Sequence, residues 1–259
     1  MMLVPNETVL ATSLNQYSSY IRKADISRDR RGTAMVKRVG RRIAAATEQY
    51  LKDNGLSERV KDFSWEFNLV KSPQLNAFCM PGGKIVVYEG ILKLMNSDDE
   101  LAVVLGHEVA HAVARHSNER MSQAVATQLG GVALNVALSE KSAETRMLGN
   151  LVYGLGAKVG IMLPYSRKHE SEADYMGMIL MSIAGYDPHA AAEFWKKMAA
   201  QNQGRKPAEF LSTHPSDSKR VKALEKNLPK ALKYRKSSAV SSKKQSGQNN
   251  EGGSYHFNF

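Results

Sequence analysis

The segment His107-Glu108-Val109-Ala110-His111 reads H-E-x-x-H, and the rest of the chain is interpreted from it. On a helix, residues i and i+4 project from the same face, so His107 and His111 can both reach one metal ion. Glu108 points to the side, where its carboxylate can act as a general base on water. The motif therefore predicts a zinc hydrolase site, with two ligands and a base from one helix.

The residues before the motif predict that it lies on a helix. Ser97-Asp98-Asp99-Glu100 has the S-x-x-E spacing of a capping box, and its acidic residues favour the positive end of a helix dipole. Apolar residues then recur at helical spacing, at Leu101, Val104, Leu105 and Val109.

Catalytic zinc takes three protein ligands and leaves one position open. One known extension of the motif, H-E-x-x-H-x-x-G-x-x-H, would supply a third histidine. Here Ala114 and Ser117 occupy its glycine and last histidine positions, and His116 is displaced by one residue. The third ligand must come from another part of the chain.

A second helix offers that ligand. In the segment from Ser166 to Asp174, Glu170 and Asp174 are four residues apart and share one helix face. Glu170 can ligate zinc, while Asp174 can accept a hydrogen bond from a ligand imidazole and fix its tautomer. Glu172 points elsewhere and is the weaker candidate. The alternative is that these acids form a solvated helix face.

H-E-V-A-H followed by E-S-E-A-D resembles the gluzincin metallopeptidases of the HtpX and CAAX prenyl endopeptidase type. The likeness is strongest to the soluble periplasmic BepA- and LoiP-like members. Further family landmarks follow in order, at residues 76–84, 163–167, 185–188 and 213–220.

The resemblance implies zinc as the cofactor and assigns a general base and three ligands, which are Glu108, His107, His111 and Glu170. It implies that His214 either assists the transition state or occupies the open metal position in a resting form. It makes Arg220 an oxyanion or structural partner.

The remaining patterns predict an α+β, mainly helical zincin (gluzincin) domain with a small β-sheet before the H-E-x-x-H helix. Helical spacing predicts helices over residues 7–21 and 35–54, and strands are expected over residues 63–70 and 84–88. We expect the second strand, through Ile85, Val86, Val87 and Tyr88, or the loop before it, to bind substrate by strand addition. The alternative is a sheet whose edge is covered.

Length and composition predict one metallopeptidase domain over residues 1–236 and a disordered polar, basic tail over residues 237–259. The net charge is +11, and the basic C-terminal region could contact an anionic membrane surface peripherally. No nucleic-acid motif accompanies this charge, so nucleic acid is not an expected partner. No apolar run reaches the length of about 18 residues typical of a membrane-spanning helix.

By resemblance, the substrate is a misfolded or extended polypeptide. The location is the bacterial periplasm or the membrane-associated envelope, although no leader-like segment begins this chain. Two rival interpretations remain: a latent or non-catalytic zincin-fold adaptor, and a surface-binding protein that acts through its basic region with H-E-V-A-H a coincidence.

Overall fold

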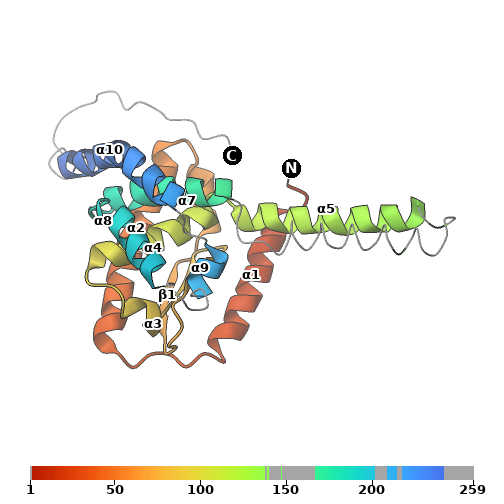
Figure 1. Ribbon diagram of the computed structural model, residues 1–259, viewed down its shortest axis with the longest axis horizontal. Coiled ribbons are helices and arrows are strands. Elements are labelled where there is room, and N and C mark those ends of the chain that lie inside the picture. Colours follow the sequence, from red (N-terminus) through yellow and green to blue (C-terminus); the bar gives the residue numbers. More distant parts are fainter. Residues whose placement is uncertain are drawn as a thin grey trace.

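The computed structural model describes residues 2–137, 139, 147, 167–201, 209–214 and 218–241. Within these ranges, helices surround a small three-stranded sheet, and the motif helix runs through the middle of the body (Figure 1). The expected mainly helical α+β architecture, with the sheet preceding the motif helix, is confirmed.

Two long helices form the N-terminal part. They are α1 (Asn6–Ile21) and α2 (Arg30–Asp53), and they confirm the helices expected over residues 7–21 and 35–54. The second helix begins five residues earlier than its apolar pattern suggested. The Asp29 side chain explains this, because it caps the helix by accepting hydrogen bonds from the backbone N–H groups of Arg31 and Gly32, both at 3.0 Å.

A short 3-10 helix, η1 (Ser57–Asp62), leads into the sheet. Its strands are β1 (Glu66–Val70), β2 (Ala77–Met80) and β3 (Lys84–Tyr88), in the spatial order β1-β3-β2. β3 pairs in parallel with β1 and antiparallel with β2. The sequence interpretation included β1 and β3 but missed β2.

This topology corrects the prediction of substrate binding along β3. Because β3 is the central strand, β1 and β2 already occupy both of its edges. Ile85, Val86 and Val87 are buried, and Tyr88 is half-buried. A chain that joins this sheet beside the motif helix would meet β2, whose outer edge runs next to that helix.

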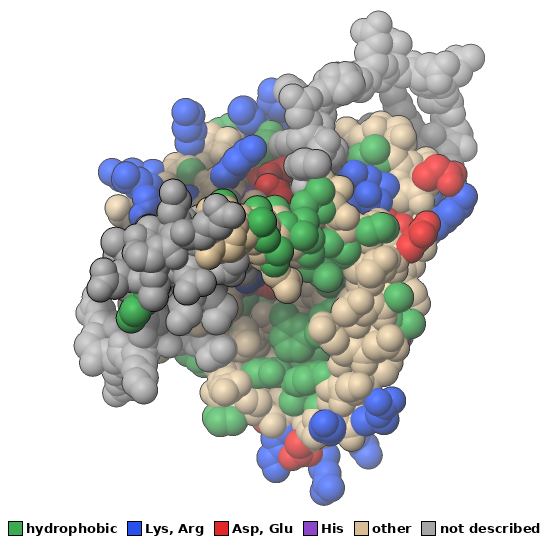
Figure 2. Space-filling view, turned by 90° about the vertical axis from the view of Figure 1, so that its right-hand side faces the viewer, with side chains coloured by type: hydrophobic (Ala, Val, Ile, Leu, Met, Phe, Trp, Pro, Cys, Tyr) green, Lys and Arg blue, Asp and Glu red, His purple; other side chains and the backbone are tan. Residues whose placement is uncertain are grey.

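The motif helix α4 (Asp98–Val113) follows the short helix α3 (Glu89–Leu92). As the capping box predicted, Ser97 Oγ accepts a hydrogen bond from Glu100 N at 3.3 Å. α5 (His116–Ala137) begins after a sharp turn at Arg115 and projects from the body (Figure 1). Hydrophobic side chains gather in the middle of the face from which α5 projects, and Lys and Arg toward its margins (Figure 2).

Four later helices complete the described structure: α7 (Arg167–Ile183), α8 (Ala190–Ala200), α9 (Glu209–Thr213) and α10 (Ser218–Ser241). Among the described residues, no helix is both long and apolar enough to cross a membrane. α10 extends past the domain boundary expected at residue 236. The rest of the expected tail, residues 242–259, lies outside the described residues.

The packing of α4 on α7 depends on two glycines. A Cβ added to Gly106 would lie 2.8 Å from the carbonyl oxygen of Gly177. A Cβ added to Gly177 would lie 2.8 Å from the backbone nitrogen of His107. These contacts are with backbone atoms, which a rotamer change cannot move, so the two helices can touch only where both residues lack a side chain.

Gly177→Ala should therefore destabilise the fold, by about 1–3 kcal/mol as is usual for overpacking a core. The measurement is the free energy of unfolding by urea titration. The sign of the change in unfolding free energy tests the close contact, because Gly→Ala inside an unconstrained helix stabilises a protein by about 1 kcal/mol. A more stable variant would show that the helices can separate at little cost.

Candidate metal centre

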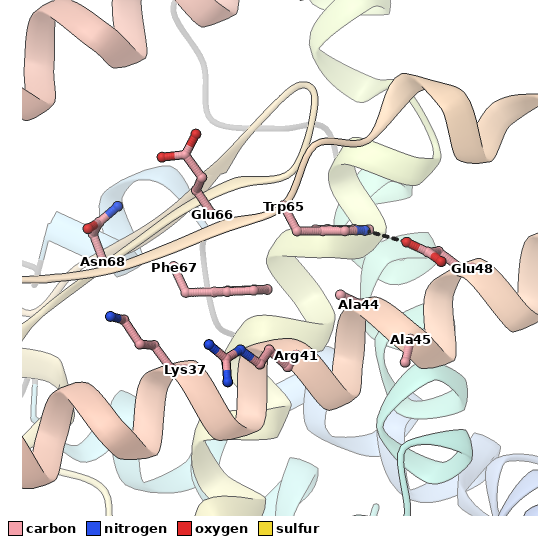
Figure 3. Close-up of a pocket in the computed structure, with 9 residues that line it drawn as sticks. All are labelled: Lys37, Arg41, Ala44, Ala45, Glu48, Trp65, Glu66, Phe67 and Asn68. Atoms are coloured by element: carbon pink, nitrogen blue, oxygen red, sulfur yellow. Dashed lines mark hydrogen bonds between the residues drawn. The ribbon is translucent and has the colours of Figure 1, made fainter.

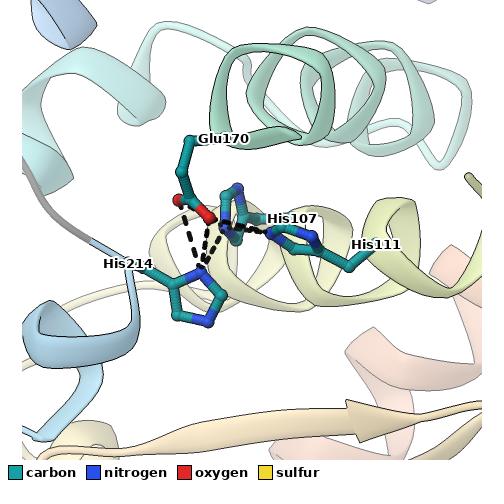
Figure 4. Close-up of side chains that lie close together, drawn as sticks. All are labelled: His107, His111, Glu170 and His214. Atoms are coloured by element: carbon teal, nitrogen blue, oxygen red, sulfur yellow. Dashed lines mark hydrogen bonds and ion pairs between the residues drawn. The ribbon is translucent and has the colours of Figure 1, made fainter. Parts of the chain in front are cut away.

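Two packed helices supply the predicted ligands. α4 presents His107 and His111 one turn apart, and α7 presents Glu170 opposite them (Figure 4). All three side chains are buried, with residue exposures of 1%, 3% and 4%. Burying two imidazoles and a carboxylate away from water is costly unless they share a cation or hydrogen bonds. This burial indicates a built site and excludes the alternative of a solvated acidic face for Glu170.

The donor atoms are spaced as zinc requires. His107 Nε2 lies 3.1 Å from His111 Nε2 and 3.4 Å from Glu170 Oε2, and His111 Nε2 lies 3.3 Å from Glu170 Oε1. Donors about 2.0–2.1 Å from a tetrahedral zinc ion would be about 3.3 Å apart. The two imidazoles and one carboxylate also match a common catalytic zinc ligand set. The residues present therefore fit a zinc ion.

His214 lies beside these three donors. It follows α9, and its Nδ1 is 3.2 Å from His107 Nε2 and 3.1 Å from Glu170 Oε1. The four donor atoms all lie within 4.8 Å of one another (Figure 4). The structure thus brings His214 to the place of a fourth donor, as one of the two predicted arrangements requires.

Glu108 lies on the other side of His214. Its Oε1 is 3.3 Å from His214 Nε2, and its Oε2 accepts a hydrogen bond from the backbone N–H of Cys79 on β2 at 3.3 Å. Burial raises the pKa of Glu108, and the neighbouring histidines lower it to a smaller extent. A raised pKa suits a carboxylate that must accept a proton near neutral pH.

Asp174 and Arg220 support the ligands from behind. Asp174 Oδ1 lies 2.9 Å from His107 Nδ1. The guanidinium of Arg220 donates two hydrogen bonds to Asp174, at 2.6 and 2.7 Å, and lies 3.0 Å from Glu170 Oε2. It also stacks on Trp195, 3.4 Å from the ring centroid. Because this fork is committed to two carboxylates, the geometry favours the structural role for Arg220 over the oxyanion role.

The electrostatics of the centre favour a cation. Burial lowers the pKa of His107, but hydrogen bonds to Asp174 and Glu170 outweigh it and raise the pKa to about 9. Burial raises the pKa of Asp174, yet Arg220 and His107 reverse this shift and hold the pKa below its usual value. The raised pKa of His107 reflects the two carboxylates beside it, and a divalent cation at this place would experience the same attraction.

Some neighbours of the centre carried no recognisable signal in the sequence. Trp195 has the spacing of any buried residue on α8, yet its ring centroid lies 5.5 Å from that of His107. His116 and Glu172 were set aside as ligands. The structure places His116 next to His111, where its Nδ1 contacts the outer nitrogen of His111, and Glu172 contacts the other nitrogen of His116.

A surface hollow of about 540 Å³ lies between α2 and β1, away from this chemistry (Figure 3). Trp65 and Phe67 face Lys37 and Arg41 across it, and Trp65 Nε1 donates a hydrogen bond to Glu48 Oε1 at 2.9 Å. None of the residues that line it belongs to the metal centre. The chemistry is therefore assigned to the buried cluster and not to this hollow.

Comparison with known proteins gives one family. The model of peptidase family M48 matches residues 32–228. The mitochondrial metalloendopeptidase OMA1 of Schizosaccharomyces pombe is 42% identical over 207 residues, which cover 80% of this chain and 56% of that protein. The corresponding protein of Arabidopsis thaliana is 40% identical over 173 residues, 67% of this chain and 33% of that protein.

A bacterial relative is less similar. The beta-barrel assembly-enhancing protease of Yersinia pestis is 32% identical over 161 residues, 61% of this chain and 33% of that protein. The chain thus resembles the mitochondrial relatives more than the bacterial type that its motifs first suggested. It spans between 33% and 56% of the length of these three relatives.

The support given by Asp174 can be tested through metal affinity. Asp174→Asn should raise the dissociation constant for zinc about 10–100-fold, because a ligand histidine loses the charged acceptor that orients it. Competition with a chromophoric chelator measures this constant. Asp187→Asn is the matched control, since Asp187 bonds to the exposed His189 and has no contact with the ligands. Equal affinities for the two variants would contradict the role of Asp174.

Proposed function

Because this chain belongs to peptidase family M48 and carries a zinc metalloendopeptidase site, we propose that it hydrolyses peptide bonds within polypeptide chains. The observation that carries this proposal is the convergence of His107, His111 and Glu170 from two helices, with Glu108 buried beside them. Three donors and an adjacent base are what metal-assisted hydrolysis requires.

Each residue then has a proposed role. When bound, zinc supplies a Lewis acid that polarises the scissile carbonyl and activates water. Glu108 takes the proton from that water and passes it to the leaving amine. Its Oε1 accepts no hydrogen bond among the described residues, although His214 Nε2 lies 3.3 Å away, so this oxygen is the one available for the proton. The N–H of Cys79 steadies the other carboxylate oxygen.

Glu108→Gln tests the general base. The variant should still bind about one zinc per chain, because the three ligands are untouched. Cleavage of an unfolded protein substrate should fall about 10²–10⁴-fold, as expected when a general base is lost. Elemental analysis measures the metal, and the rate of fragment appearance measures cleavage. Glu193→Gln, on the exposed face of α8, is the matched control.

Retained cleavage by Glu108→Gln would eliminate the general-base role. If the unsubstituted protein binds zinc but cleaves nothing, the adaptor interpretation gains support instead. If neither protein takes up metal, the peptidase function itself is excluded.

We further propose that His214 is a resting donor, not a transition-state group. Its Nδ1 lies 3.2 Å from His107 Nε2 and 3.1 Å from Glu170 Oε1, close enough to share a metal ion with them. In that position His214 fills the place that a substrate carbonyl or water must take. Turnover then requires His214 to move away, which restrains cleavage until a substrate arrives.

His214→Ala should therefore cleave a short unstructured peptide faster than the unsubstituted protein, with weaker zinc affinity. Initial rates at saturating zinc separate these two effects. A slower variant would favour the transition-state role. No turnover by either protein at full zinc occupancy would favour the latent adaptor.

For the biological role we propose protein quality control, with misfolded or extended chains as substrates. The mitochondrial endopeptidase and the beta-barrel assembly-enhancing protease support a membrane-bounded compartment, and for a bacterial source we propose the envelope. The basic side chains of α10 support peripheral contact with anionic lipid. Proteins captured by Glu108→Gln in cells would test this role, and capture of only folded soluble proteins would oppose it.

A further inference from the structure

The two ligand histidines are supported in different ways. Each directs Nε2 toward the other donors and Nδ1 away from them. The Nδ1 of His107 meets a carboxylate, Asp174 Oδ1, at 2.9 Å. The Nδ1 of His111 meets another imidazole, His116 Nδ1, at 2.8 Å. We propose that His116, backed by Glu172, is a positioning residue that holds His111 in its metal-binding tautomer; this rests on the zinc site described above.

The direction of the hydrogen bonds follows from the chemistry of imidazole. A neutral ligand that binds metal through Nε2 carries its proton on Nδ1, so His111 donates that proton. His116 Nδ1 must then be the acceptor, which places the proton of His116 on Nε2. That nitrogen lies 3.4 Å from Glu172 Oε2. The sequence of donation therefore runs from His111 to His116 to Glu172.

A break between two helices makes this contact. On an uninterrupted helix, a residue five positions after His111 would point about 140° away around the axis. Here α4 ends at Val113, Arg115 adopts φ 56°, and α5 begins at His116. The left-handed conformation of Arg115 is unfavourable for a residue with a side chain. The ion pair between Arg115 and Asp62, at 2.8 Å, helps to hold the turn.

The surroundings fix the His116 ring. His116 is 2% exposed and stacks on His169, with ring centroids 4.2 Å apart. His169 Nε2 lies 2.9 Å from Glu119 Oε2, so the stacked ring is tied to α5 as well as to α7. An immobile neutral imidazole can orient the ring of His111.

This arrangement gives Glu172 a role other than that of a metal ligand. From its position on α7, two residues after Glu170, its side chain cannot reach the donor cluster. It instead faces the start of α5, and its hydrogen bond with His116 lowers the pKa of Glu172. Glu172 Oε2 thus accepts a hydrogen bond from the Nε2–H of His116, which fixes the tautomer of that ring.

Two substitutions of His116 separate orientation from packing. His116→Phe keeps the flat ring and its stacking but removes the acceptor, and should raise the zinc dissociation constant about 10–100-fold. His116→Asn loses the ring but places Oδ1 near the former Nδ1, and should recover most of the affinity. If His116 served only to fill space, His116→Phe would bind zinc more tightly than His116→Asn. His189→Phe is the control, because His189 is exposed and contacts Asp187.

Competition with a chromophoric chelator measures these affinities, and the absorption bands of the cobalt-substituted protein report ligand geometry independently. Unchanged affinity and bands in His116→Phe would overturn the proposal. Neither readout depends on cleavage, so an inactive protein that shows the expected order would reject the peptidase function and retain this inference.

Nitrogen NMR of the zinc-loaded, unsubstituted protein, labelled at histidine, tests the same hydrogen-bond direction without any substitution. We expect protons on His111 Nδ1 and His116 Nε2. A proton on His116 Nδ1 would overturn the proposal, because that nitrogen could no longer accept.

Discussion

The metal centre depends on the contact between α4 and α7. One helix supplies two histidines and the other supplies the glutamate, so the donors converge only if the helix backbones touch. Gly106 and Gly177 allow this, since either added Cβ would meet backbone atoms of the other helix at 2.8 Å. Any larger residue at either position would separate the helices and enlarge the spacing of donors that lie 3.1–3.4 Å apart.

The contact also buries charge, and the surrounding residues compensate for it. Glu170 and Asp174 would be unstable in a closed interior without partners. Arg220 contributes one guanidinium to both carboxylates and stacks on Trp195, which fixes the fork in place. Two carboxylates share this one guanidinium, so negative charge remains beside the imidazoles for a divalent cation. Stability and metal selection therefore depend on the same few side chains.

The sequence predicted most of the centre because its chemistry is local. His107 and His111 are one helical turn apart, as are Glu170 and Asp174, so helical periodicity alone places each pair on one face. The sheet was less predictable. β2 has four residues and no distinctive alternation, and the pairing that makes β3 central is non-local. The sequence interpretation therefore placed the substrate edge on the wrong strand.

The amino-acid sequence by itself determined that His107 and His111 share one helix face, with Glu108 beside them, and that Glu170 and Asp174 share another. Periodicity within a single helix fixes these relations. Only the tertiary structure decided how the helices meet. It showed that His214 reaches the ligands, that Arg220 is committed to carboxylates, and that His116 turns back onto His111 through the bend at Arg115. Each of these contacts joins residues that do not share a helix. Helical periodicity therefore does not predict them, and only the packing of the helices determines them.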